Sequence, residues 1–240
     1  MSETPAARFY CPHLPAEPGD AADPSVELDN EQARHARRVL RLKPGDRVEL
    51  FDGAGRLARA TLDVGAGGVR CRVEHVEVHD RVGPVVTVAS AMPKGSRAED
   101  MVDMLAQLGV DRVLPLRTQR SVVHPRPGKL ERLERRAIEA AKQSRRLWVT
   151  RVEPTRDLAD VLGEEADVRL IASLGAAARP LPKIDQAVRI TVLIGPEGGW
   201  TREEEEAVRT AGYQPVSLGA HVMRIETAAV AAAAIVGSRM

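Results

Sequence analysis

The fold is decided by residues 190–236, which read ITVLIGPEGGWTREEEEAVRTAGYQPVSLGAHVMRIETAAVAAAAIV. The stretch begins with a short apolar run that is typical of a buried strand, and this run stops at the glycine-rich loop Gly195–Gly199. Thr201 and Glu204 have the spacing of a capping box, in which the two side chains satisfy free backbone N–H groups at the start of a helix. They predict a helix that follows the loop and ends near Gly212.

The same order of elements repeats in the second half of the stretch. Residues 215–218 form a second short strand that ends at Gly219, and Thr227 is expected to cap an alanine-rich helix after the loop 220–226. In an open parallel sheet, such loops lie at the carboxyl ends of the strands, where ligands bind. Neither loop has the spacing of a dinucleotide-binding or phosphate-binding motif. Ordinary tight turns of an α/β domain are the alternative interpretation.

Three blocks of this stretch resemble the signature of the RsmE family: residues 195–199 (GPEGG), 217–219 (SLG) and 222–228 (VMRIETA). RsmE proteins are RNA methyltransferases of the SPOUT superfamily that methylate N3 of a uridine in 16S ribosomal RNA. The resemblance implies an α/β domain with a parallel sheet and a C-terminal trefoil knot, which binds S-adenosyl-L-methionine and pairs as a homodimer. Topology rules alone would discard the knot, because threaded chains are rare.

The resemblance also implies which residues hold the cofactor and which take part in the reaction. The cofactor-binding residues would be Ser173, Leu174, Gly175, Ile194, Gly195, Pro196, Gly199, Leu218, Gly219, Val222, Met223, Ile225 and Thr227. N3 of uracil carries a proton, so methylation needs a base or a cation that favours the anion. We expect Arg224 to position the uracil or stabilise its anion, while a carboxylate of Glu197 or Glu226, or a water, accepts the proton. Hydrogen bonds to loop amides are the alternative role of both carboxylates.

Composition restricts the class of protein. The 240 residues can bury one large core or two modest ones, and the aromatic content of 2% leaves aliphatic side chains to fill them. A net charge of +1 means that any nucleic-acid surface must come from local segregation of charge. Two cysteines are too few for a disulfide framework or a zinc cluster, so no metal is expected. Without a signal peptide or a long apolar run, the sequence predicts a cytoplasmic protein with no membrane contact.

Residues 1–78 are predicted to form a separate domain. The segments 47–51, 57–64 and 69–78 read as short strands joined by tight turns, which is typical of a small β-barrel. The blocks RVLRLKPGD from residue 38 and LFDG from residue 50 resemble the PUA-like RNA-binding domain of RsmE proteins. From about residue 80 the pattern changes to strand, helix, strand, so residues 79–240 are assigned to the SPOUT methyltransferase domain.

Basic residues outnumber acidic ones in the segments 31–47 and 112–151. A helix is expected over residues 31–40, and four arginines at or next to it would share one face. Such a row of guanidinium groups suits RNA phosphates, although a solvated helix face is the alternative. Lys94 follows a predicted strand on the cofactor side of the sheet. The predicted RNA-binding residues are therefore Arg34, Arg37, Arg38, Arg41, Lys94, Arg120 and Arg146.

Three positions depart from the family pattern, and two other functions stay open. Arg145 stands where the family commonly has glycine, and Met104 and Gln107 replace its usual lysine and glutamate. These changes put in doubt a salt link or RNA contact made by relatives. The alternative functions are methylation of another RNA site, either a ribose 2'-hydroxyl or transfer RNA, and a non-catalytic RNA-binding role in ribosome assembly. The expected partner is 16S ribosomal RNA or the assembled small ribosomal subunit.

Overall fold

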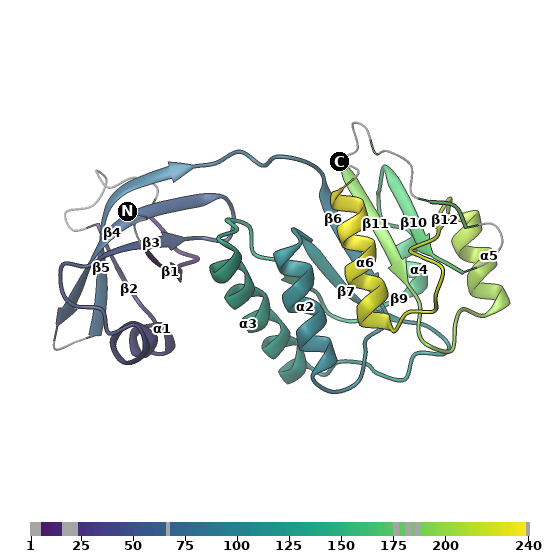
Figure 1. The fold of residues 1–240 in the computed structure, drawn as a ribbon, viewed down its shortest axis with the longest axis horizontal. Coiled ribbons are helices and arrows are strands. Elements are labelled where there is room, and N and C mark those ends of the chain that lie inside the picture. Colours follow the sequence, from purple (N-terminus) through teal and green to yellow (C-terminus); the bar gives the residue numbers. More distant parts are fainter. Residues whose placement is uncertain are drawn as a thin grey trace. The chain divides into compact units, whose positions relative to one another are not determined.

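The chain forms two compact units (Figure 1). The structure is a computed structural model that describes residues 6–15, 24–65, 68–174, 178–180, 184 and 188–238. The first unit spans Met1–Arg81 and also takes in Lys142–Val149, whereas Val82–Ala141 and Thr150–Met240 form the second. The sequence placed the segment Lys142–Val149 in the methyltransferase domain, whereas in the structure it packs with the first unit. The N–H of Val149, for example, donates to the carbonyl of Gly53 at 3.0 Å.

The first unit is built on a five-stranded sheet. Its strands lie in the order β1-β3-β4-β5-β2, and only the pairing of β1 with β3 is parallel. The strands are β1 (Ala7–Tyr10), β2 (Ser25–Glu27), β3 (Arg47–Phe51), β4 (Arg56–Gly65) and β5 (Gly68–Val78). Side chains alternate between buried and exposed along β4 and β5, as expected for a sheet with one face on a core.

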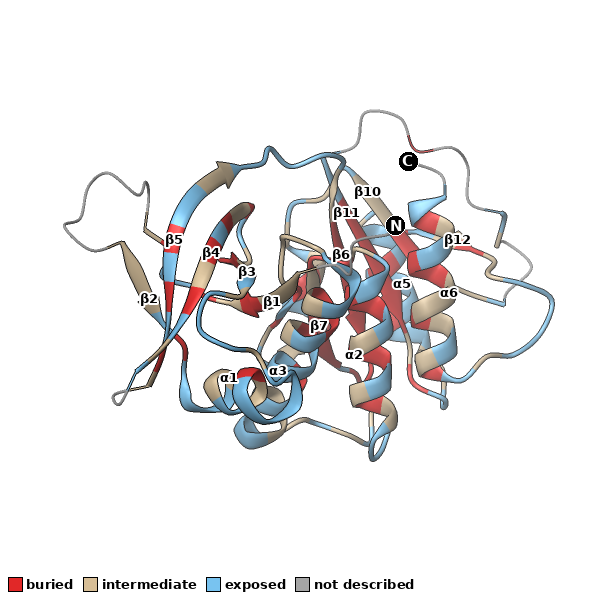
Figure 2. Cartoon of the chain, turned by 60° about the vertical axis from the view of Figure 1, so that its left-hand side comes forward, coloured by how far each residue is buried: buried red, intermediate tan, exposed pale blue. Residues whose placement is uncertain are grey.

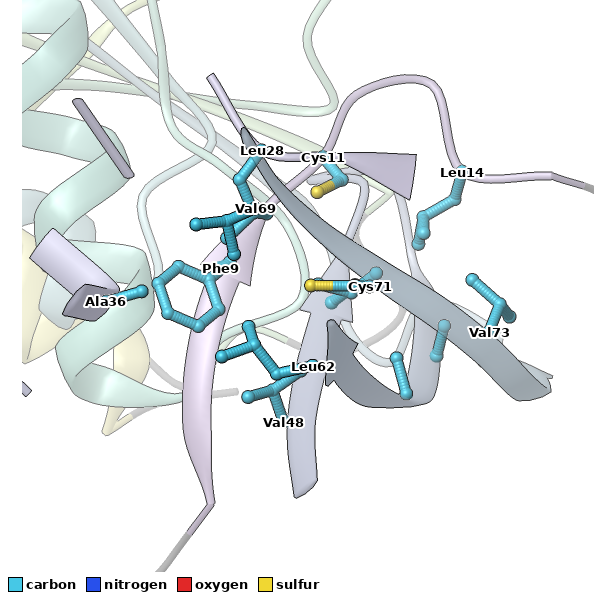
Figure 3. Packing of buried hydrophobic residues seen from close by; sticks show 13 residues of the cluster. Phe9, Cys11, Leu14, Leu28, Ala36, Val48, Leu62, Val69, Cys71 and Val73 are labelled. Carbon is cyan, nitrogen blue, oxygen red and sulfur yellow. The ribbon is translucent and has the colours of Figure 1, made fainter. Parts of the chain in front are cut away.

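Aliphatic side chains and Phe9 form the main core cluster of this unit (Figure 3). Phe9, Leu50 and Val69 are fully buried, and Ala36 brings the helical segment onto the same cluster. Burying a side chain of this size stabilises the fold by about 1.5–3 kcal/mol, so several such residues suffice without more aromatic rings. The thiols of Cys11 and Cys71 lie in the same cluster, and burial raises the pKa of each to about 12.

The helical segment of the first unit has about the predicted length, but only its first half is an α-helix. Helix α1 (Asn30–Arg34) begins after Asp29, whose carboxylate accepts the N–H of Gln32 at 2.8 Å, so Asp29 is the N-cap. The chain then widens into the π-helical turn η1 (His35–Val39). Arg41 lies beyond this turn in the left-handed region, with φ 54°.

The second unit contains a parallel sheet with the strand order β12-β10-β11-β6-β7-β8, while β9 pairs with β7. These strands are β6 (Val85–Ser90), β7 (Arg112–Arg117), β8 (Arg151–Val152), β9 (Arg156–Asp157), β10 (Val168–Ala172), β11 (Arg189–Ile194) and β12 (Gln214–Val216). The prediction of a parallel α/β sheet is confirmed.

Helices cover both faces of this sheet, as Figures 1 and 2 show. They are α2 (Arg97–Gln107), α3 (Pro127–Ser144), α4 (Leu158–Leu162), α5 (Arg202–Thr210) and α6 (Ile225–Gly237). Helix α6 packs beside α2 and against β6 and β11, while α4 and α5 bury Leu158, Val161 and Val208 against Leu193 and its neighbours. Burial on both faces explains the continuous apolar runs of the central strands.

Pro127 begins α3, and proline suits the first helical position because its missing N–H would have no partner there. The start of α6 differs from the prediction. Arg224, not Thr227, occupies the cap position of α6, so Thr227 lies inside the first turn. Among the described residues, no helix combines the length and the apolar character that crossing a bilayer requires.

Candidate cofactor and active site

The loops after β10, β11 and β12 surround one pocket of about 560 Å³ at the carboxyl edge of the sheet. This volume lies in the range of small-molecule sites. Each loop supplies one wall, because parallel strands bring their carboxyl ends to the same edge. The predicted cofactor residues that line the pocket are Ser173, Leu174, Ile194, Gly195, Pro196, Gly199, Leu218, Gly219, Val222, Met223 and Ile225.

Two predicted cofactor residues are not part of this lining. Gly175 lies outside the described residues. Thr227 is exposed in the first turn of α6 and does not line the pocket, because the helix starts earlier than its threonine suggested.

The loop after β11 needs its glycines for two separate reasons. Gly199 has φ 70°, which glycine adopts without strain, and its N–H donates to the carbonyl of Pro196 at 2.9 Å to close a turn. Gly195 is needed for space, since a Cβ there would lie 2.8 Å from Nε1 of Trp200. The indole ring of Trp200 therefore lies directly on the backbone of Gly195.

In the loop after β12, a side chain likewise lies close to a glycine. Gly219 has φ 154°, and a Cβ there would lie 3.2 Å from the terminal methyl of Met223. The Met223 side chain therefore folds back over its own loop and gives the pocket an apolar wall. Ser217 supports the turn, because its hydroxyl donates to the carbonyl of Gly219 at 3.3 Å.

Only two of the three predicted catalytic residues line the pocket. Arg224 and Glu197 both line the pocket and are exposed. Glu226 does not line it: its Oε1 accepts from Nη1 of Arg97 at 3.2 Å, which joins the start of α6 to the start of α2. Its other oxygen, Oε2, is buried without a hydrogen-bond partner among the described residues. This geometry favours a structural role for Glu226, with the guanidinium of Arg97 as its partner rather than a loop amide.

Comparison with known proteins agrees with this architecture. The family model described as RNA methyltransferase domain matches residues 82–237, and the model described as RNA methyltransferase PUA domain matches residues 28–74. The ribosomal RNA small subunit methyltransferase E of Synechocystis sp. is 34% identical over 224 residues, which cover 90% of this chain and 74% of that protein. This chain belongs to the ribosomal RNA small subunit methyltransferase E family. The resemblance to RsmE proteins is thus confirmed, as is the PUA-like domain at the N-terminus.

Further similar proteins match over nearly their whole length. The protein of the same name from Mycobacterium tuberculosis is 33% identical, and the match covers 97% of this chain and 91% of that protein. The crystal structure of the Neisseria gonorrhoeae methyltransferase E bound to S-adenosyl methionine superposes with a TM-score of 0.85 at 30% identity, covering 97% of both chains. A putative methyltransferase from Legionella pneumophila, in complex with the bound cofactor SAM, gives 0.81 at 27% identity and covers 98% of both.

The pocket also contains residues that the sequence did not single out. Trp200, Glu205 and His221 line it, together with the small residues Ala172 and Ala228. His221 stands directly before the family block at 222–228, so its position was a usable signal. Glu205 could not be told apart from Glu203 and Glu206, since only the direction of the helix decides which of them faces the pocket.

The four predicted RNA-binding arginines in and next to the segment α1–η1 are all exposed. Arg34, Arg37, Arg38 and Arg41 make no ion pair within the part of the chain that the structure describes. They do not share one face of a continuous α-helix, because the π-helical turn intervenes and Arg41 follows it.

The other three predicted RNA contacts have different surroundings. Lys94 is exposed in the loop after β6, on the same edge of the sheet as the pocket. Arg120 is exposed but donates to two carbonyl groups of the loop after β11. Arg146 is half-buried and belongs to the first unit.

The departures from the family pattern have local partners here. Arg145 has φ 59° and forms an ion pair of 2.7 Å with Glu49. Gln107 donates to Asp103 at 2.9 Å, and Arg136 pairs with the same carboxylate at 3.2 Å. Met104 is partly exposed on the same helix.

Proposed function

We propose that this chain transfers the methyl group of S-adenosyl-L-methionine to N3 of a uridine in 16S ribosomal RNA. The observation that carries the proposal is the pocket at the carboxyl edge of the sheet, whose walls are the loops that hold the three family blocks. Family membership supports the substrate class, because relatives matched over most of their length are named ribosomal RNA small subunit methyltransferases. Their substrate in turn favours a cytoplasmic location.

The residues of the pocket fit the cofactor. Loop amides and carbonyls can bond the adenine and ribose, and Met223, Ile225 and Leu218 offer apolar surface to the adenine ring. When bound, the cofactor supplies an electrophilic methyl group on a sulfonium. Transfer of that group is an in-line displacement, so the protein contributes mainly by holding donor and acceptor in near-attack geometry.

Arg224 is the cation that we assign to the uracil. Its guanidinium is at the pocket and makes no ion pair within the described residues, so it is available to a ligand. A fixed positive charge favours the anion that forms when N3 loses its proton. With Glu226 held by Arg97, Glu197 is the predicted carboxylate that still lines the pocket and can accept this proton directly or through a water.

We further infer that the second unit pairs as a homodimer with a knotted C-terminal region. Helix α6 buries Ala229, Ala232, Ala233 and Val236 within its own unit. The opposite side carries the small residues Thr227, Ala231 and Ala234, which stay partly or fully exposed and permit close approach of a second copy.

The experiment that tests the proposal maps methylated uridines on 16S ribosomal RNA by mass spectrometry. RNA from a deletion strain should lack one N3-methyluridine, and plasmid-borne wild-type protein should restore it. Arg224→Ala should lower kcat by about 10²–10³-fold, because a preorganised charge opposite a developing anion contributes on this scale. Its affinity for RNA should stay nearly unchanged. Methylation restored at a ribose 2'-hydroxyl or in transfer RNA would identify another site, and normal modification in the deletion strain would favour the assembly factor.

A further inference from the structure

A turn after β7 holds the pocket loop Gly195–Trp200 from outside. Arg120 lies in this turn, and its Nη1 donates to the carbonyl oxygens of Gly198 at 2.8 Å and of Trp200 at 3.1 Å. The aliphatic part of the side chain packs on Gly198, where an added Cβ would lie 3.3 Å from Cβ of Arg120. Arg120 thus bonds the loop twice without lining the pocket itself.

The turn that carries Arg120 is fixed by its own hydrogen bonds. The hydroxyl of Ser121 accepts the N–H of Thr118 at 3.1 Å and lies 2.8 Å from the hydroxyl of the same threonine. The position of Arg120 between these two residues is therefore set before it meets the loop.

A buried carboxylate ties the same turn to the end of the pocket loop. Oε1 of Glu204 accepts the N–H of Gln119 at 2.7 Å, and Oε2 accepts the N–H of Thr201 at 2.9 Å. Glu204 is only 7% exposed, so these charge-assisted hydrogen bonds are shielded from water. Arg120 and Glu204 hold the two ends of one short segment, residues 198–201.

The pocket wall depends on that segment. Trp200 lies on Gly195, and both residues line the pocket with Pro196, Glu197 and Gly199. If the carbonyls of Gly198 and Trp200 were released, the indole ring and the adjoining backbone amides would lose their fixed position. We propose that Arg120 is a positioning residue for the cofactor pocket, which holds residues 198–200 in the binding conformation before the cofactor arrives. This inference rests on the proposed function, because the ligand is taken to be S-adenosylmethionine.

Calorimetric titration of S-adenosylmethionine into the full chain, without RNA, tests the inference. Arg120→Ala should weaken cofactor binding about tenfold, as expected for losing two hydrogen bonds from a partly screened cation. The cofactor affinity of Arg120→Lys should lie between those of Arg120→Ala and the wild type, since an ammonium can still donate to a carbonyl. Arg126→Ala is the matched control: this arginine is exposed at the end of the same loop, its side chain makes no described hydrogen bond, and cofactor affinity should stay within about twofold.

A second variant and a second ligand make the outcome decisive. Glutamine has one oxygen and one NH₂ group, so Glu204→Gln can accept only one of the two N–H groups, from Gln119 and Thr201, that Glu204 accepts. The segment is then held less firmly, and cofactor binding should also weaken. Affinity of Arg120→Ala for a 16S RNA fragment should match wild type. If Arg120→Ala keeps its cofactor affinity but binds RNA more weakly, Arg120 is an RNA contact and the inference is overturned. An equal loss of both affinities together with a lowered melting temperature would also overturn it, because the residue would then support the fold in general. Failure of the wild-type protein to bind the cofactor would instead refute the proposed function.

Discussion

At the scale of single residues, Gly195 shows how a missing side chain shapes the pocket. A Cβ at this position meets the Trp200 ring at 2.8 Å, and that ring is held by the surrounding loop. Gly195→Val should therefore weaken S-adenosylmethionine binding by at least about tenfold, because overpacking displaces the ring at a cost of about 1–3 kcal/mol. Calorimetry measures the affinity, and thermal melting should show a largely intact fold.

The control for Gly195→Val is a glycine with free space around it. An added Cβ on Gly128 meets nothing within 4 Å, so Gly128→Ala should bind the cofactor like the wild type. Equal affinities for Gly195→Val and wild type would place the cofactor pocket elsewhere in the chain.

Asp52 is a residue whose charge stabilises the first unit. Its Oδ1 accepts the N–H groups of Ala54 at 2.7 Å and Arg56 at 2.9 Å, and its Oδ2 accepts Nε of Arg56 at 2.7 Å. Burial alone would raise the pKa of Asp52, but the hydrogen bonds from Arg56 and Ala54 outweigh it and lower the pKa. The ionised carboxylate therefore stabilises the fold above the pKa of the unfolded chain, and this contribution disappears as pH falls through the lower, folded pKa.

Asp52→Asn should accordingly lower the free energy of unfolding by about 1–2 kcal/mol at pH 7. The difference from wild type should shrink below about pH 4, where the Asp52 carboxyl group of the unfolded wild-type chain begins to take up its proton while the folded chain still holds it ionised. Urea unfolding at pH 7 and below pH 4 measures the free energy of unfolding of the variant and of the wild type. Asp63→Asn, at an exposed position of β4, serves as control. A deficit of equal size at both pH values would show that the charge is not what matters.

At the scale of elements, the segment α1–η1 carries the predicted RNA contact. If its exposed arginines bind phosphates, each contact releases counterions, and affinity falls steeply with salt. Arg38→Ala/Arg41→Ala should weaken RNA binding and flatten the plot of log affinity against log salt by roughly one unit for each lost contact. Cofactor affinity should be unchanged, because the pocket is lined by the other unit alone.

Filter binding at several salt concentrations measures that slope. Arg209→Ala removes an exposed arginine of α5 that pairs with Glu206, and it should leave the slope as it is. If the double variant keeps the wild-type slope, the segment is only a solvated surface, and the basic residues between 112 and 151 become the better candidates.

At the scale of the whole molecule, the proposed homodimer depends on the exposed side of α6. Sedimentation at micromolar concentration should give twice the mass of the 26.0 kDa chain. Ala234→Arg places a long cation on this side and should produce a folded monomer, since an unpaired charge buried in an interface is costly. Ala207→Arg, at an exposed position of α5, should leave the dimer intact. A wild-type protein that sediments as a monomer would rule out the pairing.

Features that depend on local order along the chain could be predicted before the fold was known. Apolar runs that end at glycine loops predicted the parallel sheet and the edge at which its loops gather. The capping box of Thr201 and Glu204 is confirmed in both of its hydrogen bonds. Eleven of the thirteen residues predicted for the cofactor line the pocket, because each lies in a loop that follows a strand or at the edge of such a loop.

Which side chains act together depends instead on how distant segments pack in space. Glu226 belongs to the family block at residues 222–228, yet its partner Arg97 lies on another helix. Arg120 likewise donates to the carbonyls of Gly198 and Trp200 from a loop that is far away in the chain. The segment Lys142–Val149 likewise joins the first unit although α3 begins in the second. Periodicity and capping signals report the next few residues, whereas a hydrogen bond depends on distance in space, which the packing of the helices on the sheet sets.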